Sequence, residues 1–100
     1  MVLVVFRNRL RGGDPPGYEA VATRMVELAR QQPGFRAVKT FAADDGERVT
    51  ISEFESLATV NAWRAQLEHL EAQRRGRAEF YAEYSLQTCE LIREANFAAS

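Results

Sequence analysis

Alternating apolar and polar residues predict four strands in this chain. Residues 2–10 (VLVVFRNRL) are rich in β-branched side chains and then alternate, which is typical of a strand. The first half of this run is apolar on both faces, which indicates that both faces are covered. The same alternation predicts strands over 35–43, 47–54 and 83–93. Asp44-Asp45-Gly46 is a hairpin signal between the second strand and the third.

Two stretches with apolar residues at helical spacing predict helices. Asp14 and Pro15 are expected to be the N-cap and the first residue of a helix that ends before Pro33-Gly34. Ser56 is the expected N-cap of a second helix, which runs to Gly76 and continues as a short helix to about residue 82. The expected apolar stripe of the second helix comprises Leu57, Val60, Trp63 or Arg64, Leu67 and Leu70.

The predicted order of elements is β-α-β-β-α-β, a ferredoxin-like α+β arrangement with a four-stranded antiparallel sheet. Right-handed crossovers place both helices on one face of that sheet. The opposite face carries valine and leucine residues, and an exposed apolar face of this size marks an interface. We therefore predict a homodimer that closes sheet against sheet as an α+β barrel.

Strand faces and the tail give further expectations. On the first strand, the alternate residues from Val2 to Leu10, including Phe6 and Asn8, are assigned to the helix side. On the second strand, Phe35, Ala37, Lys39 and Phe41 are expected to share one face. Residues 94–100 are expected to form a tail with Phe97 as its anchor.

Composition narrows the class of protein. One hundred residues predict a single domain over 1–100. Thirteen basic and fourteen acidic residues nearly cancel, so charge gives no argument for nucleic acid or an anionic membrane. The longest apolar run, Val2–Phe6, is too short to span a bilayer, and no signal-peptide pattern is visible. The single cysteine, Cys89, excludes an internal disulfide and fits a reducing compartment, so we expect a cytoplasmic protein.

The composition also gives no sign of a cofactor. One histidine and one cysteine provide no cluster of metal ligands. Gly12-Gly13 has neither the length nor the lysine of a phosphate-binding loop. We therefore expect neither a metal nor an organic cofactor.

The only tryptophan and the only histidine, Trp63 and His69, are the first candidates for a site. A histidine titrates near neutral pH and is the natural proton acceptor for a phenol, although a solvated surface histidine is the simpler alternative. Trp63 could form the flat wall of an aromatic pocket or simply pack in the core. Asn8 could orient a substrate oxygen or dioxygen, or bond to a neighbouring backbone group.

Other candidates are aromatic or basic. Tyr18, Tyr81 and Tyr84 are possible hydroxyl donors at a pocket rim, with packing as the alternative role. A basic cluster at Arg74, Arg75 and Arg77 could hold an anion. Acidic residues are interleaved with that cluster, which favours a solvated, salt-bridged face.

Several short motifs resemble a known family when their order and spacing are taken together. They are Asn8-Arg9, Pro33-Gly34-Phe35, Asp45-Gly46, Phe54-Glu55-Ser56, Ala62-Trp63-Arg64, Glu68-His69, Gln73-Arg74, Gly76-Arg77 and the segment Tyr81 to Tyr84. In this order they resemble the antibiotic biosynthesis monooxygenase (ABM) family of dimeric α+β barrels.

The resemblance implies a cofactor-independent monooxygenase that acts with dioxygen on a phenolic or quinol-like aromatic molecule. It implies catalytic roles for Asn8, Trp63 and His69, in a pocket between sheet and helices. Substrate-binding roles are expected for Phe6, Tyr18, Tyr81 and Tyr84.

Two alternatives share the scaffold. One is a non-catalytic module that binds small hydrophobic ligands or serves in a stress response. The other is a haem-degrading enzyme, whose branch of the family uses an asparagine and a tryptophan that Asn8 and Trp63 match. The position of that branch's iron-ligating histidine holds Gln73 here, and His69 lies about one helical turn earlier.

Overall fold

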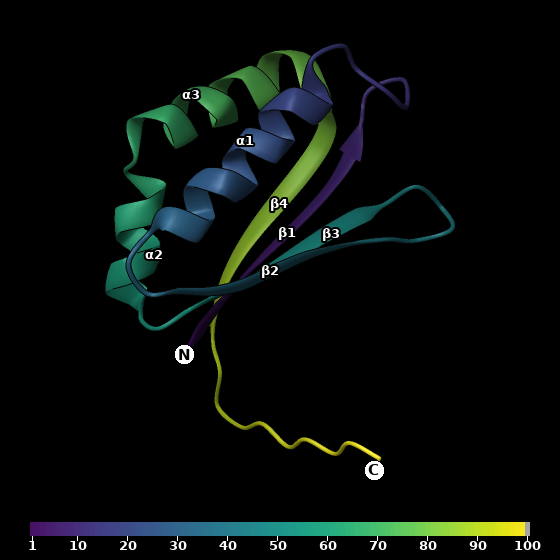
Figure 1. The fold of residues 1–100 in the computed structure, drawn as a ribbon. Helices are drawn as coiled ribbons and strands as arrows, with labels where there is room; N and C mark the ends of the chain where they lie inside the picture. Colours follow the sequence, from purple (N-terminus) through teal and green to yellow (C-terminus); the bar gives the residue numbers. More distant parts are fainter. Residues whose placement is uncertain (100) are drawn as a thin grey trace.

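A computed structural model describes residues 1–99 and shows a four-stranded antiparallel sheet with every helix on one face (Figure 1). The strands lie in the order β2-β3-β1-β4. Their bounds are β1 Val2–Leu10, β2 Phe35–Ala42, β3 Arg48–Phe54 and β4 Tyr81–Glu90. The helices are α1 Tyr18–Gln31, α2 Leu57–Arg64, α3 Leu67–Arg75 and the short π-helix η1 Gly76–Phe80. The ferredoxin-like α+β prediction is therefore confirmed.

The first helix begins later than expected. Asp14 and Pro15 do not start it; α1 begins at Tyr18, after Gly17 at φ 84°. The Tyr18 amide donates to the Pro15 carbonyl, so Pro15 belongs to a turn that precedes the helix. A positive φ at this position favours glycine, which has no Cβ. Glycine also has no side chain that could cap a helix, so α1 has no side-chain cap.

The second helix is broken into two, which corrects the expected continuous helix. Ser56 is the N-cap of α2, as predicted, and forms a capping box with Thr59. The helix ends at Arg64, and Gln66 adopts an extended conformation before α3 begins. The break turns α3 away from the expected stripe, so Val60 and Trp63 are buried whereas Leu67 is 82% exposed.

The last strand begins at Tyr81, where the sequence predicted helix. Its pairing with β1 shifts register between Arg9 and Leu10, and the shift leaves Ala82 without a partner opposite it. Tyr81 pairs with Leu10, and Tyr84 pairs with Asn8. Residues three apart on a regular strand point to opposite faces, so this bulge brings both tyrosines to the helix side.

A second irregularity corrects the expected face of Phe35. The β2–β3 register shifts between Phe35 and Ala37, which separates Phe35 from the alternation that follows it. Its ring meets Phe54 edge to face with 5.8 Å between ring centroids. Phe35 thus packs against the core, which is built from Val2, Leu28, Ala29, Phe54, Val60 and Trp63.

The face of the sheet opposite the helices carries an apolar patch. This open-face patch comprises Leu3, Val5, Phe41, Val49 and Ile51, and Val5 pairs with Ile51 across two neighbouring strands.

The segment after β4 runs away from the sheet (Figure 1). Phe97 is 93% exposed, so the prediction that it anchors this segment to its own chain is wrong. No helix among residues 1–99 is long and apolar enough to cross a membrane.

Candidate functional site

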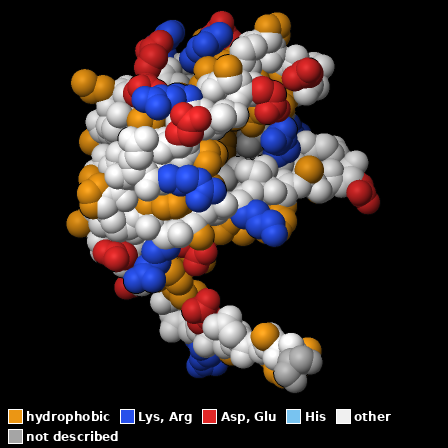
Figure 2. All heavy atoms as spheres, viewed as in Figure 1, with side chains coloured by type: hydrophobic (Ala, Val, Ile, Leu, Met, Phe, Trp, Pro, Cys, Tyr) orange, Lys and Arg blue, Asp and Glu red, His pale blue; other side chains and the backbone are white. Residues whose placement is uncertain are grey.

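A cavity of about 420 Å³ lies between the sheet and the helical layer. Figure 2 shows a hollow, lined with hydrophobic atoms, between the helices and the projecting β2–β3 hairpin. The floor is the helix-side face of the sheet, including Val4 and Phe6, and one wall is α1, including Ala22 and Met25. The remaining wall comes from α2, α3 and η1. The break between α2 and α3 therefore determines which side chains of this wall face the cavity.

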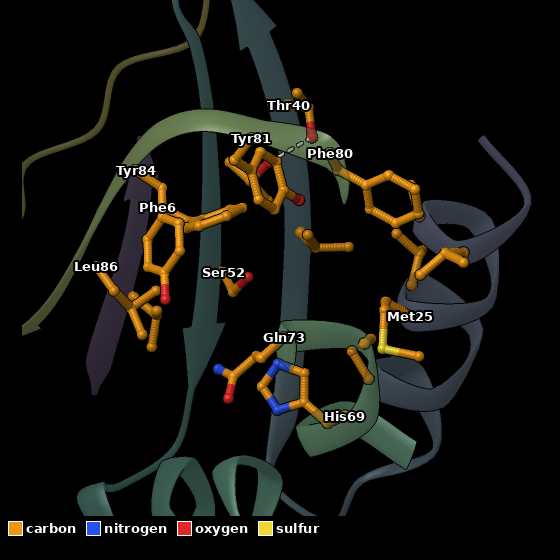
Figure 3. Close-up of a pocket in the computed structure, with 18 of the residues that line it drawn as sticks. Phe6, Met25, Thr40, Ser52, His69, Gln73, Phe80, Tyr81, Tyr84 and Leu86 are labelled. Atoms are coloured by element: carbon orange, nitrogen blue, oxygen red, sulfur yellow. Dashed lines mark hydrogen bonds between the residues drawn. The ribbon is translucent and has the colours of Figure 1, made fainter. Parts of the chain in front are cut away.

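Six of the seven predicted site residues line this cavity. They are Phe6, Tyr18, Trp63, His69, Tyr81 and Tyr84. Figure 3 shows Phe6, Tyr81 and Tyr84 on the sheet side and His69 on α3, all directed at the same space. The structure thus brings these side chains together, and their roles stay predictions.

Asn8 is the exception. It lies on the helix side of β1, as predicted, but it is only 3% exposed and is not among the lining residues. Its neighbours across the strands are Arg48 on β3 and Tyr84 on β4. Its Oδ1 atom has no hydrogen-bond partner within the described chain. Asn8 is therefore buried between Arg48 and Tyr84 of the neighbouring strands and does not line the cavity.

His69 is held in one orientation by the helix break. The Gln66 side chain accepts a hydrogen bond from the His69 amide at 2.7 Å and so caps α3. The imidazole stacks on the Trp63 indole with 4.1 Å between ring centroids and 15° between planes. Two residues six apart on one continuous helix lie about 240° apart around its axis, so this stack requires the break.

The hydrogen bond of His69 also fixes its tautomer. Nδ1 lies 3.1 Å from the carbonyl oxygen of Trp63, and a carbonyl only accepts, so Nδ1 carries the proton. Nε2 then has a free lone pair. Burial lowers the pKa of His69 below its usual 6.5, with a smaller lowering by Arg64, although the bond to Trp63 opposes both. The neutral imidazole is therefore the form present at neutral pH.

This lowered pKa predicts an acid-sensitive contribution to stability. As pH falls through 6.5, the unfolded chain takes up a proton on His69 before the folded chain does, so the free energy of unfolding falls. Thermal unfolding between about pH 7.5 and 5.5, above the range where carboxylates titrate, should show this decrease. His69→Gln should flatten the curve in this window, and an equally steep curve in the variant would contradict the buried neutral imidazole.

The tyrosines form an aromatic group at the other side of the cavity. Tyr81 makes edge contacts with Phe6, Tyr18 and Tyr84 at centroid distances of 5.3, 6.1 and 5.8 Å. Burial is the largest cause that raises the pKa of Tyr81 above its ordinary value, and the neighbouring Tyr18 raises it further. The Tyr81 hydroxyl therefore remains protonated and can donate to an oxygen atom in the cavity.

Sequence reasoning missed several polar lining residues. Thr50 and Ser52 lie on the helix side of β3, on the same face as Phe54. Their alternation with Phe54 along the sequence is the signal that predicts this shared face. Gln73 lines the cavity beside His69 (Figure 3). Arg77 lines it too, and because Arg77 is exposed it also belongs to the solvated face that the sequence predicts.

The predicted salt bridges are found at the other two arginines of the cluster. Arg74 and Arg75 form ion pairs with Glu71 and Glu79. Within residues 1–99 no group of three histidine, cysteine or acidic side chains is placed to hold a metal ion.

Comparison with known proteins relates this chain to one protein family and to one bacterial protein. Residues 1–75 match the family model described as antibiotic biosynthesis monooxygenase. The protein YqjZ of Bacillus subtilis, itself uncharacterised, is 34% identical over 94 residues, which cover 94% of this chain and 82% of that protein.

Two solved structures are similar over most of their length. SnoaB, a cofactor-independent oxygenase from Streptomyces nogalater, is 25% identical with a TM-score of 0.70, covering 91% of this chain and 94% of its own. Rv0793 from Mycobacterium tuberculosis gives a TM-score of 0.81 at 19% identity, covering 95% and 98%. At that identity the likeness to Rv0793 shows the fold alone.

Proposed function

The chain belongs to the antibiotic biosynthesis monooxygenase family, and from that premise we propose that it is a cofactor-independent monooxygenase for a phenolic or quinol-like aromatic molecule. The observation that carries the proposal is the arrangement of His69. A neutral imidazole presents an unprotonated Nε2 at an apolar cavity walled by aromatic rings. The description of SnoaB as a cofactor-independent oxygenase supports the same class of reaction.

The first step is proton transfer. His69 Nε2 accepts the proton of a phenolic hydroxyl, and the Nδ1–H bond to the Trp63 carbonyl stabilises the imidazolium that forms. Trp63 stacks on one face of His69 and keeps bulk water away from it. From the other side of the cavity, the protonated Tyr81 hydroxyl donates to a second oxygen of the substrate over which the anionic charge is delocalised, because donors that are already oriented stabilise such charge best.

The second step is oxygenation of the bound anion. The phenolate gives one electron to dioxygen, and the resulting radical and superoxide combine to form a carbon–oxygen bond at a ring C–H position. The His69 imidazolium returns its proton to the peroxide oxygen. The ring carbon then loses its own proton as the O–O bond breaks, so the ring becomes a quinone, and the second oxygen leaves as hydroxide, which takes up that proton to form water. One phenol and one dioxygen thus give one quinone and one water, and no external reductant enters the balance.

The proposal is tested by oxygen consumption with a panel of phenols and hydroquinones and no added cofactor. Ala22→Phe places a ring in the cavity from α1 and should lower kcat/KM about tenfold, because pocket shape governs productive binding. Thr23→Phe is the matched control, since Thr23 is exposed and does not line the cavity. Absence of uptake across the panel, or an equal loss in both variants, would contradict the proposal.

The same panel separates the alternatives. Thermal stabilisation by aromatic molecules without product would favour a ligand-binding module. A shifted Soret band on titration with haem would favour the haem branch, despite Gln73 at the expected ligand position.

We also propose that the chain forms a homodimer through the open-face patch. The patch places five apolar side chains on neighbouring strands, and a small domain gains stability by covering such a surface. The resemblance to dimeric α+β barrels supports a second copy of the chain as the partner.

Val5→Glu should convert the dimer to a monomer. Val5 lies at the centre of the open-face patch, opposite Ile51, and a carboxylate there would be buried without a partner in the dimer. Sedimentation of the wild type and the variant measures the difference. Thr23→Glu adds the same charge on exposed α1 and should leave the dimer intact; a Val5→Glu protein that sediments like the wild type would contradict the proposed interface.

A further inference from the structure

The cavity carries charge of only one sign. Its ionised lining residues are Arg64 and Arg77, and no aspartate or glutamate among residues 1–99 lines it. The chain as a whole has fourteen acidic and thirteen basic residues, so composition does not explain this asymmetry. A cavity with low-dielectric walls and one sign of charge favours a ligand of the opposite sign.

Among residues 1–99 the two lining arginines have no carboxylate partner, whereas six of the twelve arginines of the chain form ion pairs. Arginines elsewhere on the surface form ion pairs with carboxylates, namely Arg7, Arg9, Arg24, Arg36, Arg74 and Arg75. Within the described part of the chain, Arg64 and Arg77 form none. Arg77 donates from Nη1 to the Tyr84 hydroxyl at 3.4 Å, a long contact to a neutral group. Its guanidinium therefore keeps most of its donors for another acceptor.

A third arginine, Arg48, lies close to Tyr18 on the tyrosine side of the cavity. The Arg48 guanidinium lies 5.4 Å from the ring centre of Tyr18, which itself lines the cavity. Its Nε atom is buried and has no hydrogen-bond partner among residues 1–99. Arg48 adds positive potential to the side where Tyr18, Tyr81 and Tyr84 meet, and no carboxylate of the described chain neutralises it there.

We propose that this cavity selects aromatic ligands that carry a carboxylate or a similar anionic oxygen group, with Arg77 as the residue that binds this group beside Tyr84. A guanidinium binds a carboxylate through two parallel hydrogen bonds, a geometry that a neutral amide cannot reproduce. Tyr84 and His69 enter the cavity from different walls (Figure 3), so an anion at Arg77 leaves the rest of the aromatic ring for His69. The inference rests on the proposed function for its site and specifies the substrate class.

Two probes of equal shape test the inference without turnover. 2-Naphthoate and 2-naphthamide differ in charge but scarcely in size, and neither has a phenolic hydroxyl. Trp63 is the only tryptophan and lines the cavity, so quenching of its fluorescence reports binding at this place. We expect naphthoate to bind the wild type at least about tenfold more tightly than naphthamide, because charge-assisted bonds are the stronger ones.

Variants of Arg77 and Arg93 test which residue causes the preference for naphthoate over naphthamide. Arg77→Gln should abolish it while the Kd of naphthamide stays unchanged, which also shows that the variant is folded. Arg77→Lys should retain part of it, because lysine keeps the charge but not the paired donors. Arg93→Gln removes an exposed arginine from the segment after β4 and should leave the preference intact.

Equal affinity of the two probes for the wild type, or a preference that survives Arg77→Gln, would overturn the inference. Both outcomes are independent of oxygen consumption. A preference for naphthoate in a protein that consumes no oxygen would reject the proposed monooxygenase and leave the anion selectivity standing.

Discussion

Replacing His69 with glutamine is expected to lower kcat/KM for oxygen consumption by about 10² to 10⁴, the usual contribution of a positioned general base. Glutamine can still donate to the Trp63 carbonyl, but its amide does not accept a proton at neutral pH. The loss therefore reports proton transfer and not the loss of a hydrogen bond. Steady-state oxygen electrode measurements with a phenol that the wild type oxidises provide the comparison.

The pH profile gives the second part of this result. The wild-type kcat/KM should fall as the pH drops through the pKa of His69, because the imidazolium cannot accept a proton. Burial lowers that pKa, so the acid limb should lie below pH 6.5, and activity at neutral pH should be nearly independent of this group. The residual activity of the variant should show no such limb.

Gln73→Asn is the control for this prediction. Gln73 lies beside His69 on α3 and also lines the cavity, but its amide has no basic nitrogen. Shortening it should leave the acid limb in place. If His69→Gln retained wild-type kcat/KM, or if its acid limb persisted, His69 would not be the base.

Gly34→Ala is expected to lower the free energy of unfolding by about 2–4 kcal/mol, the sum of left-handed strain and loss of a helix cap. Gly34 has φ +83°, and an added Cβ would lie 2.3 Å from Thr59 Cγ2. Thr59 cannot retreat freely, because its amide and hydroxyl form the capping box with Ser56. The substitution therefore strains the α1–β2 turn and the start of α2 together.

Two matched variants divide that loss, and chemical denaturation measures all of them. Gly13 has φ +90° with no atom within 4 Å of an added Cβ, so Gly13→Ala should show the backbone strain alone. Thr59→Ser removes the methyl group that clashes and keeps the capping hydroxyl, so Gly34→Ala should cost less in that background. Equal losses for Gly34→Ala and Gly13→Ala would show that Thr59 is not held in place.

The fold followed from the sequence because its signals were local. Alternation and turn residues located all four strands, and the Ser56 cap located the start of α2. The errors came where a single residue changes the direction of the chain. Gln66 carries no breaker signal, yet its extended backbone divides the predicted helix and exposes Leu67. Such a break is accompanied by contacts that periodicity does not reveal, here the Gln66 cap on the His69 amide and the stack of His69 on Trp63.

The candidate site was only partly predictable for the same reason. Tyr81 and Tyr84 reach one face because of a bulge, which periodicity alone does not reveal. Asn8 has the expected face but is buried and does not line the cavity, since alternation along a strand predicts the side of the sheet and not the burial of a side chain. The place of Arg77 in the cavity lining was hidden by neighbouring glutamates, which pair with Arg74 and Arg75 instead.

If this cavity oxygenates an aromatic ring without a cofactor, an oxygen atom of dioxygen must enter the product, and isotope labelling detects it. Purified protein, dialysed against a chelator, is incubated with a phenol or hydroquinone that it consumes under ¹⁸O-labelled dioxygen. One labelled oxygen should appear in the quinone and the other in water, with no added flavin, haem or metal. A product without label, or turnover that begins only when one of those groups is added, would contradict oxygenation without a cofactor.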